Sequence, residues 1–214
     1  MPANTQPFSA VIFDLGGVLI DWNPRHLYRK LFNDRAAMEE FLSTVCTPEW
    51  NSTLDAGYPI ADAVATLSAV HPDRAPLIEA YSERWGEMLD GPHEATVTLL
   101  DELRARDVHL YALTNWSAET FPIAIHRFEF LGWFEDILVS GSEGVVKPDP
   151  AIYDLAIERF EVEPHRTVFI DDAPANVAAA ARAGLHAHHY QDAARLRAYL
   201  RRCGLLDDPG GQRV

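Results

Sequence analysis

Residues 10–18 read AVIFDLGGV, and this stretch decides the fold class. Its first part, residues 10–15, is short, apolar and rich in β-branched and aromatic side chains, and it runs into Gly16 and Gly17. A short apolar run of this kind is typical of a strand that is buried on both faces, as in parallel sheets. Comparable runs recur at residues 109–113 (HLYAL), 137–139 (ILV), 167–170 (TVFI) and, more weakly, 185–190 (LHAHHY).

Helical patterns lie between these runs. Residues 95–106 carry apolar side chains three and four positions apart. Residues 150–160 begin with a proline after Asp149, a favourable N-cap, and residues 174–183 end at Gly184, a favourable residue after a helix. This alternation predicts an α/β fold with a Rossmann-like three-layer core, in which helices cover both faces of a parallel sheet.

The alternation is interrupted between about residues 24 and 89, where only helical patterns occur. We expect helices at residues 27–32, 37–45, 60–70 and 77–89, separated by Pro48, by GYP at 57–59 and by HP at 71–72. This region is either an insertion that merely packs on the sheet or a separate α-helical cap over the carboxyl ends of the strands. Because about 65 residues exceed any ordinary connection, we expect a cap at residues 23–89 and a core of residues 1–22 and 90–214.

Composition and charge exclude several classes of protein. Of the 214 residues, 48% are hydrophobic and 23% are charged, which excludes disordered, collagen-like and disulfide-framework chains. The two cysteines are far apart, which suits a reducing cytoplasm, and the first residues carry no secretory pattern. A formal net charge of −14 disfavours binding to nucleic acid and to anionic membranes. We therefore expect a cytoplasmic protein with a small-molecule substrate, and the oligomeric state stays open.

Polar side chains follow the expected strands at the edge of the sheet where ligands bind. In chain order they are Asp14, then Thr114 with Asn115, then Lys147, then Asp171 with Asp172. Taken singly, an aspartate or a Thr-Asn pair after a strand is ordinary turn chemistry. Adjacent carboxylates at the end of a buried run repel each other unless a cation lies between them, and Mg²⁺ prefers such oxygen ligands. Their common position predicts one magnesium site.

These residues belong to four motifs, which are FDLGGV (13–18), LTN (113–115), KPDPAIY (147–153) and FIDD with Asn176 beyond it (169–176). In this order, and with the helical insertion after the first motif, they resemble the haloacid dehalogenase (HAD) superfamily of aspartate-nucleophile hydrolases. The resemblance runs from about residue 11 to the last helices. It implies a HAD-like core with a helical cap and a phosphohydrolase activity on a small phosphorylated metabolite, such as a sugar phosphate.

The resemblance also implies a role for each residue. Asp14 would attack phosphorus and form an aspartyl-phosphate. Magnesium would be held by Asp14, the Gly16 carbonyl and Asp172, with Asp171 beside it. The Thr114 hydroxyl and the Asn115 amide would bind the phosphate, and Lys147 would offset the carboxylates. Substrate contacts are further expected at Gly16, Gly17, Trp116 and Arg25, although Arg25 is equally interpretable as a solvated arginine at a helix start.

The sequence departs from the family pattern at Gly16, where phosphatases usually carry a second aspartate as general acid and base. Loss of such a group slows ester hydrolysis by about 10²- to 10⁴-fold. Asp21 is a candidate substitute, and its alternative role is to cap the first helix of the cap.

Two other functions stay open. A 2-haloacid dehalogenase uses the same nucleophile without metal and needs no second aspartate, because halide leaves without a proton. Such enzymes, however, typically replace both acids of the FIDD motif. A non-catalytic HAD-like binding protein is the third candidate, and the presence of Asp14, Lys147 and Asp172 together argues against it. We expect the phosphohydrolase.

Overall fold

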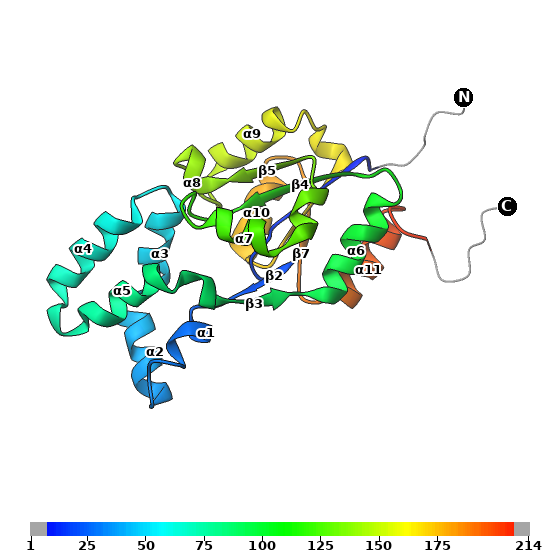
Figure 1. The fold of residues 1–214 in the computed structure, drawn as a ribbon. Coiled ribbons are helices and arrows are strands. Elements are labelled where there is room, and N and C mark those ends of the chain that lie inside the picture. Colours follow the sequence, from blue (N-terminus) through cyan, green and yellow to red (C-terminus); the bar gives the residue numbers. More distant parts are fainter. Residues whose placement is uncertain (1–7, 208–214) are drawn as a thin grey trace, which may run out of the picture.

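The structure is a computed structural model that describes residues 8–207. A five-stranded parallel sheet, of which β4, β5 and β7 are labelled in Figure 1, has the order β5-β4-β1-β6-β7, with β1 at its centre. The strands are β1 (Ala10–Phe13), β4 (His109–Thr114), β5 (Asp136–Val139), β6 (Thr167–Asp171) and β7 (His186–His189). The strands predicted from the apolar runs are confirmed, and so is the α/β fold class.

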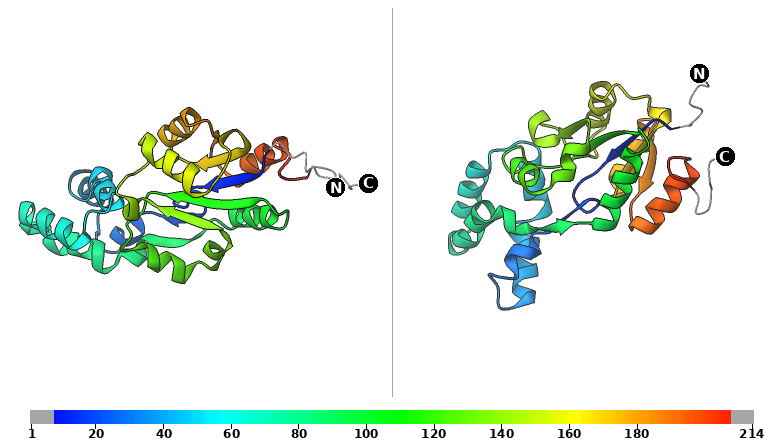
Figure 2. Two further views of the ribbon diagram at one scale, coloured as in Figure 1. Left: turned by 90° about the horizontal axis from the view of Figure 1, so that it is seen from above. Right: turned by 45° about the vertical axis from the view of Figure 1, so that its right-hand side comes forward.

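Helices cover both faces of this sheet (Figure 2). They are α6 (Glu94–Arg104), α7 (Phe121–Arg127), α8 (Ser140–Glu143), α9 (Pro150–Arg159), α10 (Pro174–Arg182) and α11 (Ala193–Arg202), with the 3₁₀ helices η3 (Glu129–Trp133) and η4 (Pro164–Arg166). Along β1, Ile12 belongs to the core cluster with α9 and α10, whereas Val11 and Phe13 belong to the cluster with α6 and α11. This alternation confirms the three layers. The predicted core helices match α6, α9 and α10, whereas α7 and α8 carried no recognised pattern.

A second group of helices lies beyond one end of the sheet (Figure 1). It comprises α1 (Arg25–Tyr28), α2 (Arg35–Thr44), α3 (Pro48–Asp55), α4 (Ile60–Val70) and α5 (Ala75–Glu83), with η1 (Pro72–Arg74) and η2 (Trp85–Met88). Helix α3 contacts α8, which directly follows β5, so the group lies at the carboxyl ends of the strands. The Ser140 hydroxyl donates to the Asp55 carbonyl at 2.6 Å, and the Ile60 N–H donates to Glu119 Oε1 at 2.9 Å.

Two short strands were not predicted. β2 (Ile20–Trp22) and β3 (Leu89–Pro92) pair antiparallel and carry the chain into and out of the helical group. Three residues are too few to show a pattern, and β3 contains a glycine and a proline, which are unfavourable in strands. The expected helix at residues 77–89 was therefore too long, because α5 ends at Glu83 and Leu89 already belongs to β3.

Helix α3 was also missed, because Pro48 was interpreted as a break. Proline is favourable in the first helical turn, where its missing N–H costs nothing. Thr47 caps the helix, since its Oγ1 accepts a hydrogen bond from the Trp50 N–H at 3.2 Å. The proline therefore starts a helix that the sequence analysis left as a connection.

We propose to divide the chain into a core, residues 1–22 and 90–214, and a cap, residues 23–89. Residues 1–7 and 208–214 of that division lie outside the described residues. This proposal is supported by β2 and β3, which carry the two crossings between the sheet and the helical group. Within the described residues 8–207, no helix has the length and apolar character needed to cross a membrane.

Candidate active site

The ends of three adjacent strands meet at the candidate site. The register places Phe13 of β1 opposite Ile170 of β6, so Asp14 and Asp171, which follow them, lie side by side. On the other side of β1, Thr114 ends β4. The parallel pairing that buries the apolar runs therefore brings these polar side chains to one edge.

Lys147 joins the two carboxylates from the loop that follows α8. Its Nζ lies 3.0 Å from Asp14 Oδ1 and 2.6 Å from Asp171 Oδ2, and its side chain is 1% exposed. Burial alone lowers the pKa of Lys147, but Asp14 and Asp171 outweigh it, so the pKa lies above its ordinary value. A charged ammonium is thus fixed beside the predicted nucleophile.

Asp171 is held by several hydrogen bonds. Its Oδ1 accepts from the Ala173 N–H at 2.9 Å, and Asn176 Nδ2 donates to both of its oxygens at 3.0 and 3.1 Å. Together with Lys147 these donors occupy both carboxylate oxygens. Asp171 thereby positions Lys147.

Asn115 fixes the Lys147 loop from the other side. Its Nδ2 donates to the Lys147 carbonyl at 2.9 Å, and its Oδ1 accepts from the Lys147 N–H at 2.8 Å. This reciprocal pair gives the Asn115 side chain a positioning role that its sequence motif did not reveal. The hydroxyl of the neighbouring Thr114 forms no hydrogen bond with the described residues, so it can donate to a ligand.

The two glycines after the nucleophile differ in their surroundings. Gly17 has a φ of +72°, and a Cβ there would collide with the Asp172 carboxylate. Gly16 does not adopt a left-handed conformation, and a Cβ there would meet nothing within 4 Å. Gly17 thus allows Asp172 to approach the loop, whereas Gly16 leaves open space where the family usually places a carboxylate.

The donor set at this edge fits a magnesium ion. Carboxylate oxygens of Asp14, Asp171 and Asp172 lie within 4.8 Å of one another, and Lys147 alone is ion-paired with this cluster in the described chain. Burial raises the pKa of Asp14 to about 7 against the effect of Lys147, and Asp171 adds to the rise. Burial, followed by the charge of Asp171, also raises the pKa of Asp172. A divalent cation with oxygen ligands relieves such crowding of negative charge.

A pocket adjoins this site between the core and the cap. Its core walls are formed by Gly16, Trp22, Asn115, Trp116, Ser117 and Thr120, and its cap walls by Asn51, Leu54, Asp55, Ile60 and Trp85. Trp116 therefore lines the pocket, and its contact with substrate stays a prediction. Arg25 does not, because its guanidinium is paired with Glu39, with Nη2 2.6 Å from Oε2.

Asp55 is a pocket residue that the sequence analysis missed, because it ends the unrecognised helix α3. It is half-buried, and its Oδ2 accepts from Asn51 Nδ2 at 2.8 Å. Burial raises the pKa of Asp55 to about 7, although the Ser117 backbone amide and Asn51 oppose this effect. No sequence signal distinguished it from the other acidic residues of the cap.

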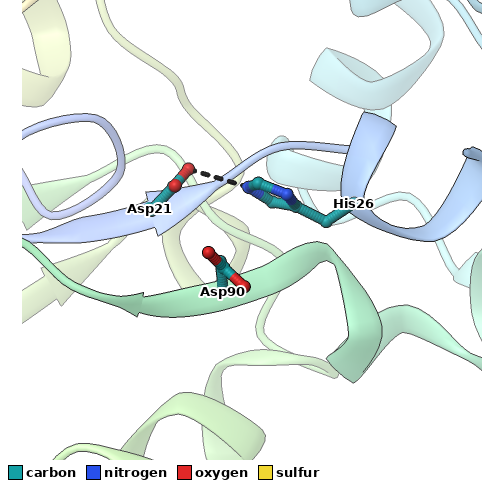
Figure 3. Close-up of side chains that lie close together, drawn as sticks. All are labelled: Asp21, His26 and Asp90. Carbon is teal, nitrogen blue, oxygen red and sulfur yellow. Dashed lines mark hydrogen bonds and ion pairs between the residues drawn. The ribbon is translucent and has the colours of Figure 1, made fainter.

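Asp21 lies elsewhere, on β2 beside His26 and Asp90 (Figure 3). Its Oδ1 is 3.0 Å from His26 Nε2, and ligand atoms of the three residues lie within 4.8 Å of one another. The first N–H of α1, that of Arg25, is bonded to Asn23 Oδ1 at 3.0 Å. Asp21 therefore neither lines the pocket nor caps α1.

Comparison with known proteins agrees with this geometry. The chain is 26% identical over 186 residues to a sesquiterpene phosphatase from Aspergillus oryzae, covering 86% of this chain and 91% of that protein. It is 27% identical to a phosphorylated carbohydrates phosphatase from Thermotoga maritima, covering 82% of each. Its fold is similar to that of a HAD family enzyme from Bacteroides thetaiotaomicron in complex with magnesium and inorganic phosphate, with a TM-score of 0.64 and 22% identity over 86% of this chain and 95% of that chain.

The sequence model of one family covers most of the chain. The description of that family is haloacid dehalogenase-like hydrolase, and the match spans residues 8–184. This span includes the Asp14 loop, the Lys147 loop and the paired aspartates described above. The chain belongs to the haloacid dehalogenase-like hydrolases and is a hydrolase.

Proposed function

We propose that this hydrolase is a magnesium-dependent phosphohydrolase that acts through an aspartyl-phosphate on Asp14. The observation that carries the proposal is the buried Lys147, paired with Asp14 and Asp171 at the strand ends beside Asp172. A dehalogenase needs no third carboxylate there. The phosphatases among the relatives, and the magnesium and phosphate in a structural neighbour, support the same choice.

The residues of the chain divide the work as follows. Asp14 Oδ1 is held by the Leu15 N–H at 2.7 Å and by Lys147, which leaves Oδ2 to attack phosphorus. Thr114 and the backbone amide of Asn115 donate to phosphate oxygens, and Lys147 supplies a fixed positive charge. Asp14, Asp172 and the Gly16 carbonyl would hold magnesium, which supplies charge neutralisation for the transferring phosphoryl group.

The proposed substrate is a small phosphorylated metabolite, such as a sugar phosphate, whose alcohol part occupies the pocket. Trp22, Trp85 and Trp116 offer flat apolar surfaces, and Asn51 and Asp55 offer polar atoms. Such a mixture suits a hydroxylated ring. The sesquiterpene phosphatase among the relatives indicates that a longer apolar alcohol belongs in the substrate panel.

The proposal is tested with a panel of phosphate esters and 2-haloacids, assayed with magnesium and with a chelator. We expect magnesium-dependent phosphate release and a covalent phosphoenzyme detectable by mass spectrometry. Asp14→Asn should abolish both while the circular dichroism spectrum is retained, because an amide is a poor nucleophile. Chelator-resistant halide release without phosphatase activity would establish the dehalogenase instead. Absence of turnover of every compound would support the non-catalytic alternative.

A further inference from the structure

We propose that Asp55, from the cap, is the general acid and base of this enzyme and replaces the carboxylate that is absent at Gly16. The inference rests on the proposed phosphohydrolase function. Among the described residues that line the pocket, Asp55 is the one with an acidic side chain. It therefore shares with Gly16 the space that the leaving alcohol would occupy.

The space around Gly16 supports this assignment. A Cβ at Gly16 would meet nothing within 4 Å, so neither packing nor backbone conformation explains the missing side chain. Asp55 closes the same pocket from the opposite lobe. A proton donor can thus reach the leaving group from the cap side while Asp14 attacks from the core side.

A negative charge on Asp55 is unfavourable for the stability of helix α3. It is the last residue of α3, where the helix dipole disfavours a negative charge. Its carboxylate is held by Asn51, whose Oδ1 accepts a hydrogen bond from the Tyr81 hydroxyl. This chain of contacts holds the carboxyl group of a residue that lines the pocket in a fixed position, as a proton donor requires.

The electrostatic surroundings favour a proton on Asp55 near neutral pH. Burial raises the pKa of Asp55 to about 7, against the Ser117 amide, Asn51 and the charge of Lys147. The other titratable group that faces it is Tyr81, and burial, followed by the charge of Asp55, raises the pKa of Tyr81 well above its usual value. Tyr81 is thus neutral, and Asp55 can alternate between its two forms.

Asp14 and Asp55 together account for every bond and proton in the proposed reaction. As Asp14 bonds to phosphorus, the ester P–O bond breaks and the Asp55 carboxyl gives its proton to the leaving oxygen, which departs as the alcohol. The Asp55 carboxylate then takes a proton from the water that attacks the aspartyl-phosphate. Inorganic phosphate leaves, and Asp14 and the protonated Asp55 are regenerated.

A purely structural role for the side chain is the competing explanation. The hydrogen bond from Ser140 of the core uses the Asp55 backbone carbonyl, which substitution of the side chain preserves, whereas the Ser117 backbone amide interacts with the carboxylate itself. Asp55→Asn keeps the size of the side chain and one acceptor oxygen, so it preserves one of the two contacts that Asn51 Nδ2 and the Ser117 amide make with the carboxylate. The matched control is Asp62→Asn, the same change at an exposed position of α4 in the cap.

The experiment compares kcat/KM for p-nitrophenyl phosphate, whose leaving group scarcely needs a proton, with kcat/KM for propyl phosphate, whose leaving group does. For Asp55→Asn we expect a loss of about 10²- to 10⁴-fold on the alkyl ester and little change on the aryl ester. A burst of p-nitrophenolate followed by slow turnover should appear, because the second step lacks its base. Adding Gly16→Asp to this variant should restore part of the alkyl activity.

A pH profile provides a readout that loss of packing would not reproduce. The profile is measured at saturating magnesium, because a cation bound to Asp14 favours the ionised nucleophile, whose pKa is otherwise raised to about 7. With wild-type enzyme, kcat/KM for propyl phosphate should then fall as the pH rises through about 7, because the acid loses its proton. This alkaline limb should be missing in Asp55→Asn. Equal losses of kcat/KM on both esters, or an unchanged alkyl rate, would overturn the assignment. If wild-type enzyme cleaves neither ester, the proposed function itself fails. If Asp55→Asn does not fold, the wild-type enzyme still provides a test. A wild-type kcat/KM for propyl phosphate that does not fall as the pH rises above about 7 would overturn the assignment.

Discussion

At the scale of single residues, the adjacent glycines Gly16 and Gly17 differ in whether the structure requires a glycine at their position. Gly17 has a left-handed backbone and lies directly under the Asp172 carboxylate, so a side chain would be both strained and obstructed. Gly16 has neither restriction. Steric demand explains Gly17, whereas the cap carboxylate that we propose as the acid explains how the chain can function with glycine at position 16.

We predict that Gly17→Ala lowers stability by about 1–2 kcal/mol, the cost of a Cβ in a left-handed conformation, with a further cost from displacing Asp172. For a chain of this size the melting temperature should fall by roughly 2–8 °C, at about 2–4 °C for each kcal/mol. The matched change Gly16→Ala should leave it unchanged or slightly higher, because alanine reduces the entropy of the unfolded chain. Thermal melts of the two variants test the pair, and equal losses would contradict the distinction.

At the scale of elements, the sequence predicted the helices and strands that have long or strongly apolar patterns. The parallel strands were predictable because their apolar runs are buried on both faces, and α4 was predicted with its bounds, Ile60–Val70. The catalytic edge followed from them, since the strands bring Asp14 and Asp171 together. β2 and β3 were not predictable, because their formation depends on pairing between distant segments. Helix α3 was missed although Thr47 before Pro48 is the same cap-and-proline pattern that predicted the helix after Asp149, because Pro48 was interpreted as a break. Asp55 was missed with α3.

We predict that Thr47→Ala destabilises the protein by about 1 kcal/mol, because the Trp50 N–H loses its capping oxygen. The melting temperature should fall by roughly 2–4 °C. Thr53→Ala is the control within the same helix, since Thr53 is exposed and alanine has the higher helix propensity. If Thr53→Ala destabilises as much as Thr47→Ala, the start of α3 does not depend on this cap.

At the scale of the whole molecule, the proposed chemistry depends on contact between the two lobes. The proposed nucleophile, Lys147 and the proposed metal ligands belong to the core, whereas the proposed acid belongs to the cap. The lobes touch where Gly57, with a φ of +91°, faces the Gly141 backbone, and a Cβ at Gly57 would lie 2.7 Å from the Gly141 oxygen. Since Gly57 follows α3 closely, this contact sets how near Asp55 comes to the core.

We predict that Gly57→Ala separates the lobes and lowers kcat/KM for propyl phosphate by roughly 10- to 100-fold, since a misplacement of about 1 Å can cost about 10²-fold. Gly204→Ala is the matched control: Gly204 is also left-handed, with a φ of +73°, but a Cβ there would meet nothing within 4 Å. Both variants should lose stability, because alanine is strained in a left-handed conformation. A loss of activity that appears in Gly57→Ala and not in Gly204→Ala is therefore due to displacement of the cap and not to backbone strain. Cleavage of p-nitrophenyl phosphate by Gly57→Ala should fall less than cleavage of propyl phosphate, because the core alone supplies what the aryl ester needs. An equal loss of activity in both glycine variants would show that strain, and not contact between the lobes, limits the enzyme.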